Sequence, residues 1–307
     1  MKKIRFYVAL SVVLLGFTAC TDEEDTSPSY ADQNLFAPSE SDQSEMAELR
    51  RNFYKETSAY LLFNDTLYKQ QNGMDAYGNP IWNVELVDLA YSLIGEAISY
   101  RYTYKYIEGS ENKKRAANLI KEKLAERLGK AVPYSFLIVD SITTWENNNG
   151  VWEIVVPYYY SDVEAHPIQL LGTRCYAIST NGDTGYQDED YFTTVFKKIV
   201  LNKLERLSGD KLSAFYSYGE KYYQVGKTEF DIPYGVDDHL ARTHGFWKDY
   251  NYYYFAMRHF DLEYFTDAVC TYSPSEVEEM MAGYPLVIER FNLLREIIKS
   301  MGIKVID

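Results

Sequence analysis

FTTVFKKIVLNKLERL, residues 192–207, is the stretch that decides the fold prediction, because it has the period of a core-facing helix. At about 100° per residue, its apolar side chains fall on one broad face. They are Phe192, Val195, Phe196, Ile199, Val200, Leu204 and Leu207. Lys203 and Arg206 lie inside the same arc, so they either reach solvent along their apolar stems or point into a polar cavity. The helix alone leaves both alternatives open.

From Tyr54 to the C-terminus, the chain resembles the zinc-binding metallopeptidase lipoproteins, whose central helix carries HExxH after a short apolar run. In an alignment on VFKKIVLNKLERL, Asn202 stands where that family has the first His of the motif. Lys203 stands in place of the general-base Glu, and Arg206 in place of the second His. The resemblance therefore implies an α+β, zincin-like metallopeptidase scaffold with a mixed β-sheet, several helices and a helical C-terminal part.

The three replacements argue against zinc chemistry at these positions. A zinc peptidase needs two imidazoles one helical turn apart, a third ligand, an open position for water and a carboxylate that takes the water's proton. Asn202 is a poor zinc ligand, and Lys203 and Arg206 are cations that would repel the metal. We therefore expect no metal and no catalytic residue here, and interpret the three residues as degenerate active-site positions.

The segment FDLEYFTDAVCT, residues 260–271, completes the resemblance. It stands where the family carries an EDFAE-like stretch close to the metal helix, and Glu263 and Asp267 match the two outer carboxylates. Tyr264 departs from the inner Asp. If the helices pack as in that family, Arg206 would pair with one carboxylate and Lys203 with the other, in a buried cluster that replaces the metal. The alternative is an exposed acidic helix face.

The first 45 residues predict export and lipid anchoring. Residues 1–20 have a basic start, an apolar run and the ending Thr18, Ala19, Cys20, which is the order of a lipoprotein signal peptide. Cys20 would become the lipidated N-terminus, and the acidic run 22–25 is similar to the tag of surface-exported lipoproteins. Residues 21–45 are interpreted as a solvated tether, and 46–307 as a single metallopeptidase-like domain. The predicted location is the outer membrane, with the domain exposed at the cell surface.

Charge and composition restrict the partners. The chain of 307 residues has a net charge of -14, which excludes a nucleic-acid partner because phosphates require a basic surface. Its 30 tyrosines indicate either a Tyr-rich core and boundary layer or a stacking platform for sugars or peptides. Cys175 and Cys270 are expected to be buried free thiols, although their spacing does not exclude a disulfide.

The rest of the chain alternates between helical and strand patterns. Helices are predicted at 45–53, 84–104, 111–128 and 212–218, with an irregular loop at 70–80. Strands are predicted at 59–67, 133–142, 151–156 and 173–179. Near the end, Ser273 and Glu276 form a capping box. A last helix buries Val287, Phe291, Leu294, Ile298 and Met301 and ends at Gly302.

The histidines near the C-terminal part do not form a convincing metal motif. His239 and His244 are five residues apart, about 140° around a helix, so they cannot share a ligand face there. His259 lies fifteen residues beyond His244. A designed metal site is therefore not expected here.

Three functions compete. The first is a non-catalytic surface lipoprotein that keeps a metallopeptidase-like cleft for binding. The second is a zinc metallopeptidase with rebuilt ligands, drawn from Glu263, Asp267 and one histidine. The third is a glycan-binding lipoprotein of a nutrient-uptake system. We favour the first, with a peptide or glycan as ligand and no cofactor.

Overall fold

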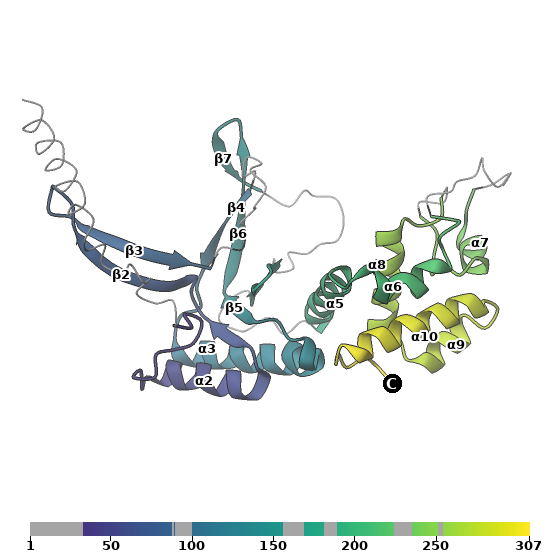
Figure 1. The fold of residues 1–307 in the computed structure, drawn as a ribbon, viewed down its shortest axis with the longest axis horizontal. Coiled ribbons are helices and arrows are strands. Elements are labelled where there is room, and N and C mark those ends of the chain that lie inside the picture. Colours follow the sequence, from purple (N-terminus) through teal and green to yellow (C-terminus); the bar gives the residue numbers. More distant parts are fainter. Residues whose placement is uncertain are drawn as a thin grey trace, which may run out of the picture. The chain divides into compact units, whose positions relative to one another are not determined.

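The apolar run that predicted a buried strand forms the centre of a four-stranded sheet in the computed structural model (Figure 1). β5 (Ser135–Val139) is buried along its whole length and runs parallel to β1 (Tyr60–Leu62) and β9 (Cys175–Ser179). The edge strand β8 (Gln169–Leu171) is antiparallel to β9, so the order is β1-β5-β9-β8. The sheet is therefore mixed, and its central strands have apolar side chains on both faces.

The structure describes residues 33–87, 89, 100–155, 169–180, 189–223, 235–250 and 254–307. Phe36–Asp307 forms one compact unit, distinct from Met1–Leu35. The predictions for the signal peptide and for Cys20 lie outside the described residues. Within them, the architecture is mixed α+β, with several helices and small sheets, as the sequence predicted.

The strands of two smaller sheets alternate in the sequence with those of the central sheet. β2 (Thr66–Met74) and β3 (Pro80–Leu86) form an antiparallel ribbon. The turn between them is held by Asp75, whose Oδ1 accepts hydrogen bonds from the backbone N–H groups of Tyr77 and Asn79, both at 2.8 Å. β4 (Tyr100–Lys105), β6 (Ser141–Asn148) and β7 (Val151–Ile154) form an antiparallel three-stranded sheet.

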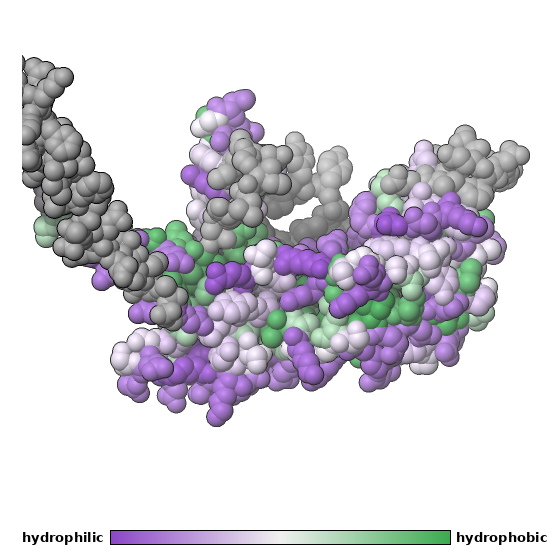
Figure 2. Space-filling view, in the orientation of Figure 1, coloured by the Kyte–Doolittle hydropathy of each residue, from purple (hydrophilic) through white to green (hydrophobic). Residues whose placement is uncertain are grey.

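Helices from the N-terminal half pack against the central sheet. α2 (Glu45–Thr57) begins at its cap Ser44, whose side chain accepts a hydrogen bond from the N–H of Ala47. Figure 2 shows hydrophilic side chains over the outward side of α2. α3 (Ser110–Ile120) continues through a π-helical turn, Lys121–Ala125, into the short α4 (Glu126–Leu128) and a 3₁₀ turn, Gly129–Ala131.

From Glu189 to the C-terminus, the described residues are mainly helical. This part contains α5 (Glu189–Glu205), α6 (Gly209–Ser217), α7 (Asp238–Thr243), α8 (Arg258–Thr271), α9 (Pro274–Met280) and α10 (Pro285–Ser300). The predicted capping box is confirmed at α9, where Ser273 and Glu276 exchange side-chain to backbone hydrogen bonds. The predicted stripe on α10 is also confirmed for Val287, Phe291, Leu294 and Ile298, all of which are buried. Met301 is half-buried against the same core.

One hydrophobic core joins the sheet to the C-terminal helices. It includes Phe136 of β5, Phe196 of α5 and Phe291 of α10. The ends of α4 and α10 meet at two glycines with positive φ, Gly129 and Gly302. A Cβ on Gly129 would lie 2.4 Å from the carbonyl oxygen of Gly302, so only glycine fits at this approach.

Three local predictions are wrong. The helix predicted at 84–104 is instead strand at both ends, in β3 and β4. Its middle lies outside the described residues, apart from residue 89. The loop predicted at 70–80 is largely part of the β2–β3 ribbon. Finally, Phe36 is buried in a small cluster with Leu62 and Val139, so the tether is not solvated at that residue.

Candidate functional site

Three of the residues that the resemblance places in a degenerate active site lie in the last turn of α5 or directly after it. The apolar arc is confirmed from Phe192 to Leu204, and Leu207 is half-buried. Asn202 is half-buried, and its Oδ1 accepts a hydrogen bond of 3.2 Å from the hydroxyl of Tyr176 on β9. Lys203 is half-buried, and burial, with a smaller effect of Arg206, lowers the pKa of its ammonium. Arg206 follows the helix and is exposed.

The two predicted acidic partners lie on α8, which packs against α5. Glu263 is exposed. Asp267 is also exposed, and its Oδ1 is 2.6 Å from the Nζ of Lys197, one α5 residue that the prediction did not consider. The described residues show no ion pair from Lys203 or Arg206 to either carboxylate. The predicted buried cluster is therefore wrong, and the alternative of an exposed acidic face describes Glu263 and Asp267 better.

The side chains at these positions do not fit the zinc ion that the resemblance implies. Asn202, Lys203 and Arg206 supply one weak ligand and two cations, which oppose a divalent metal. Across the described ranges, no three His, Cys, Asp or Glu side chains come together as ligands. His239 Nδ1 is hydrogen-bonded to the hydroxyl of Tyr284 at 2.7 Å, and His259 packs on Phe260.

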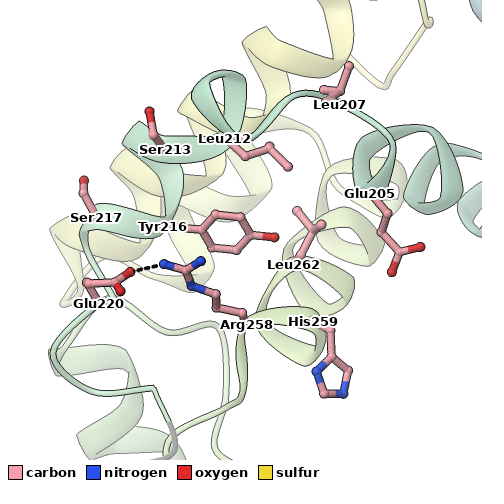
Figure 3. A pocket seen from close by; sticks show the side chains of 11 residues that line it. Glu205, Leu207, Leu212, Ser213, Tyr216, Ser217, Glu220, Arg258, His259 and Leu262 are labelled. Atoms are coloured by element: carbon pink, nitrogen blue, oxygen red, sulfur yellow. Dashed lines mark hydrogen bonds and ion pairs between the residues drawn. The ribbon is translucent and has the colours of Figure 1, made fainter.

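A cavity of about 580 Å³ opens beside the end of α5 (Figure 3). Its walls come from the end of α5, from α6 and from the start of α8. Leu207, Leu212 and Leu262 supply apolar surface, and the ring of Tyr216 lies between α6 and α8. Its volume is in the range of sites that take a small ligand or a single large side chain.

Charged groups surround this apolar cavity. Glu205 is exposed on the α5 side. On the other side, Glu220 and Arg258 form an ion pair, which raises the pKa of Arg258. The guanidinium of Arg258 also lies over the rings of Tyr216 and Tyr223, at 5.0 and 5.7 Å from their centroids. Two carboxylates and one guanidinium leave the cavity with a net negative charge.

Tyr223 links the cavity wall to a fully buried ion pair. Its hydroxyl donates to Asp261 Oδ2 at 2.8 Å, and the same carboxylate pairs with Arg290 of α10. Arg290 also donates to the carbonyl oxygen of Gly245 at 2.7 Å. Its guanidinium lies against the rings of Phe215 and Phe265, at 4.3 and 4.7 Å from their centroids. Burial raises the pKa of Asp261, and the hydrogen bonds from Arg290 and Tyr223 oppose that effect.

The sequence interpretation missed this buried pair, although two signals were present. Arg290 lies in the apolar stripe of α10, one turn after Val287 and one turn before Leu294. Asp261 lies one turn before Phe265 on the buried face of α8. A charged residue inside an apolar stripe predicts a buried partner, because an unpaired buried charge is costly. The apolar stripe of α10 contains Arg290, and that of α8 contains Asp261. The two patterns together indicate that Asp261, rather than Glu263 or Asp267, is a buried carboxylate with a cationic partner.

Comparison of the chain with protein-family models, with curated proteins and with solved structures found no match. Among the helices that the structure describes, none has the length and apolar content that crossing a bilayer requires. The proposal for function therefore depends on the geometry of the cavity and on the sequence.

Proposed function

We propose that this protein is an outer-membrane lipoprotein, exposed at the cell surface, that binds peptides without hydrolysing them. Its scaffold would be zincin-like, and its ligand site would be the α5–α6–α8 cavity. A mixed sheet that precedes a long core-facing helix supports the scaffold. The order of residues 2–20 supports the anchor, with Cys20 as the lipidated residue.

The absence of hydrolysis is supported by the chemistry of the last turn of α5. The turn offers Asn202, Lys203 and Arg206 where a zinc peptidase needs two imidazoles and a carboxylate. Lys203 and Arg206 would also raise the energy of a bound divalent cation. No step of peptide hydrolysis can be assigned to these three side chains.

The observation that carries the binding proposal is the combination of an apolar cavity with negative charge at its rim. Leu207, Leu212 and Leu262 can cover the methylene stem of a lysine or arginine side chain. The carboxylate of Glu205 can then accept hydrogen bonds from the cationic end. Because Glu220 is paired with Arg258, Glu205 is the better candidate for this contact. We therefore expect a peptide with a basic side chain to bind best.

A pair of matched peptides tests the proposal. One is a fluorescein-labelled hexapeptide with a central lysine, and the other has norleucine at that position, which keeps the stem and removes the charge. Fluorescence anisotropy should show binding to the lysine peptide that is up to about fivefold tighter, since an ion pair with an exposed carboxylate contributes up to about 1 kcal/mol. Glu205→Gln should remove most of this difference.

Glu278→Gln provides a matched control, because Glu278 is exposed on α9 and does not line the cavity. It should bind both peptides like the wild type. Equal binding of the two peptides by the wild type, or an unchanged preference in Glu205→Gln, would refute the role of the cavity. Cleavage of the peptide that stops on removal of zinc would favour the metallopeptidase alternative.

A further inference from the structure

The three-stranded sheet β4–β6–β7 has two faces of different charge. Residues directly opposite each other in an antiparallel ladder share a face. Arg101 of β4 lies opposite Trp145 of β6, and Asn147 of β6 lies opposite Trp152 of β7. These four side chains therefore belong to one face, which we call the Arg101 face. The strand acids Glu146 and Glu153 are opposite each other and lie on the other face.

The guanidinium of Arg101 lies over two indole rings on this face. Its guanidinium carbon is 5.0 Å from the centroid of Trp145 and 4.6 Å from that of Trp152. The indole Nε1–H of Trp145 donates to Thr103 Oγ1 at 2.9 Å, which fixes the orientation of one ring. Stacking against rings restrains a planar guanidinium, so its N–H fork is already ordered before any ligand arrives.

The fork has no acidic partner in the parts of the chain that the structure describes. Lys105, the other cation on the Arg101 face, is paired with Asp140 at 2.8 Å. Among the described residues, the contacts recorded for its guanidinium are those with the two indole rings, and Arg101 is exposed. In a chain with a net charge of -14, an arginine that has no acidic partner among the described residues, on a face without strand acids, is an anion-binding feature.

We propose that the Arg101 face is a second ligand site, which binds an acidic saccharide. The carboxylate of a uronic acid residue would accept two hydrogen bonds from Arg101. The C–H face of the sugar ring would lie on the part of the Trp145 and Trp152 indoles that the guanidinium leaves open, and Asn147 would contact its hydroxyl groups. A small carboxylate ligand has no ring that could stack on the indoles, and an acidic peptide has no row of hydroxyl groups. An acidic saccharide has a carboxylate, a ring and hydroxyl groups, so it matches the Arg101 face best.

Calorimetric titration of the full chain with tri-galacturonate tests this site, with its methyl ester as the neutral counterpart. The wild type should bind the acid about tenfold more tightly than the ester, as expected for loss of a hydrogen-bonded charge. Arg101→Lys keeps the charge but loses the planar fork, and it should weaken binding of the acid by a similar factor of about ten. Trp152→Leu should weaken the binding of both the acid and the ester.

Arg258→Lys is the matched control, because Arg258 lines the α5–α6–α8 cavity and is absent from this sheet. It should leave the titration with tri-galacturonate unchanged. Because the two sites lie on different elements, a failure of the peptide proposal would not affect this test. The proposal is overturned if the wild type does not bind the acid or binds the ester equally well. Tighter binding of tri-glutamate than of tri-galacturonate would also overturn it. The comparison of acid with ester uses the wild type alone and does not depend on the folding of a variant.

Discussion

The carboxylate of Asp261 and the guanidinium of Arg290 form an ion pair from which solvent is fully excluded. The pair joins α8 to α10, and the hydroxyl of Tyr223 and the carbonyl oxygen of Gly245 make further hydrogen bonds to it. Removal of one partner would leave the other charge buried without compensation. We therefore expect loss of either partner to destabilise the fold, although neither residue lines the proposed ligand site.

Asp261→Ala and Arg290→Ala should each lower the free energy of unfolding by about 3 to 5 kcal/mol, because each leaves a buried charge unpaired. The double variant should lose much less than the sum of the two. Urea unfolding of the four proteins measures this. The exposed pair of Glu220 and Arg258 is the control, with an expected loss of at most about 1 kcal/mol. Simple additivity for Asp261 and Arg290 would show that their contact contributes little.

The protein purified without chelator should contain no stoichiometric zinc, because Asn202, Lys203 and Arg206 do not form a zinc site. The triple variant Asn202→His, Lys203→Glu and Arg206→His restores the HExxH spacing and should gain zinc affinity. Elemental analysis of both proteins is the measurement. About one zinc per wild-type chain would contradict our interpretation, and a triple variant that stays metal-free would argue against the alignment.

Cys175 and Cys270 should not react with a thiol reagent in the folded protein. Both are buried free thiols, and burial raises the pKa of Cys175 to about 11 and that of Cys270 to about 12. The nucleophilic thiolate is therefore scarce at neutral pH. Ellman's reagent should detect both thiols only after unfolding in urea. Rapid labelling of either one in native buffer would show that its site opens readily.

The capping box of α9 should make stability depend on pH through Glu276. Hydrogen bonds from Ser273 lower the pKa of this carboxyl below its ordinary value of 4.5. A lowered folded-state pKa adds stability above the unfolded-state value, and that stability is lost as the pH falls through the folded-state value. The wild type should therefore exceed Glu276→Gln in stability at pH 7, and the gap should shrink below pH 4.5. A gap that stays constant down to pH 2 would contradict this.

Cys20 should carry the lipid anchor. Cells that express the wild type should incorporate labelled fatty acid into the protein, and Cys20→Ala should not, because the thiol is the acceptor. The labelled wild type should fractionate with the outer membrane. Equal labelling of the two proteins would exclude this cysteine as the acceptor.

The sequence predicted those elements whose pattern is local. Helical spacing predicts three features that the structure confirms. They are the apolar arc of α5, the capping box of Ser273 and Glu276, and the buried stripe of α10. Tyr100, Tyr102 and Tyr104 alternate strictly with polar residues, which is a local signal for the strand β4. The helical spacing of the apolar residues before them nevertheless led to a helix prediction for 84–104. The β2 strand gave no such signal, because cross-strand pairing stabilises its polar run.

The candidate site was less predictable, because it depends on contacts between distant segments. Lys197, and not Lys203 or Arg206, reaches Asp267. The geometry of α5 against α8 decides this, and a helical wheel of either element alone cannot supply it. The stack of Arg101 with Trp145 and Trp152 likewise depends on the register of three strands.

The close approach of Gly129 and Gly302 has a consequence for the order in which the chain folds. The backbone N–H of Lys304 donates to the carbonyl oxygen of Arg127 at 2.8 Å beside these glycines. Residues 302–304 therefore contact a segment about 175 residues earlier in the sequence. Contacts between segments so distant in sequence form slowly, because a long loop must close first. We therefore expect the contact between residues 127–129 and 302–304 to form late in folding.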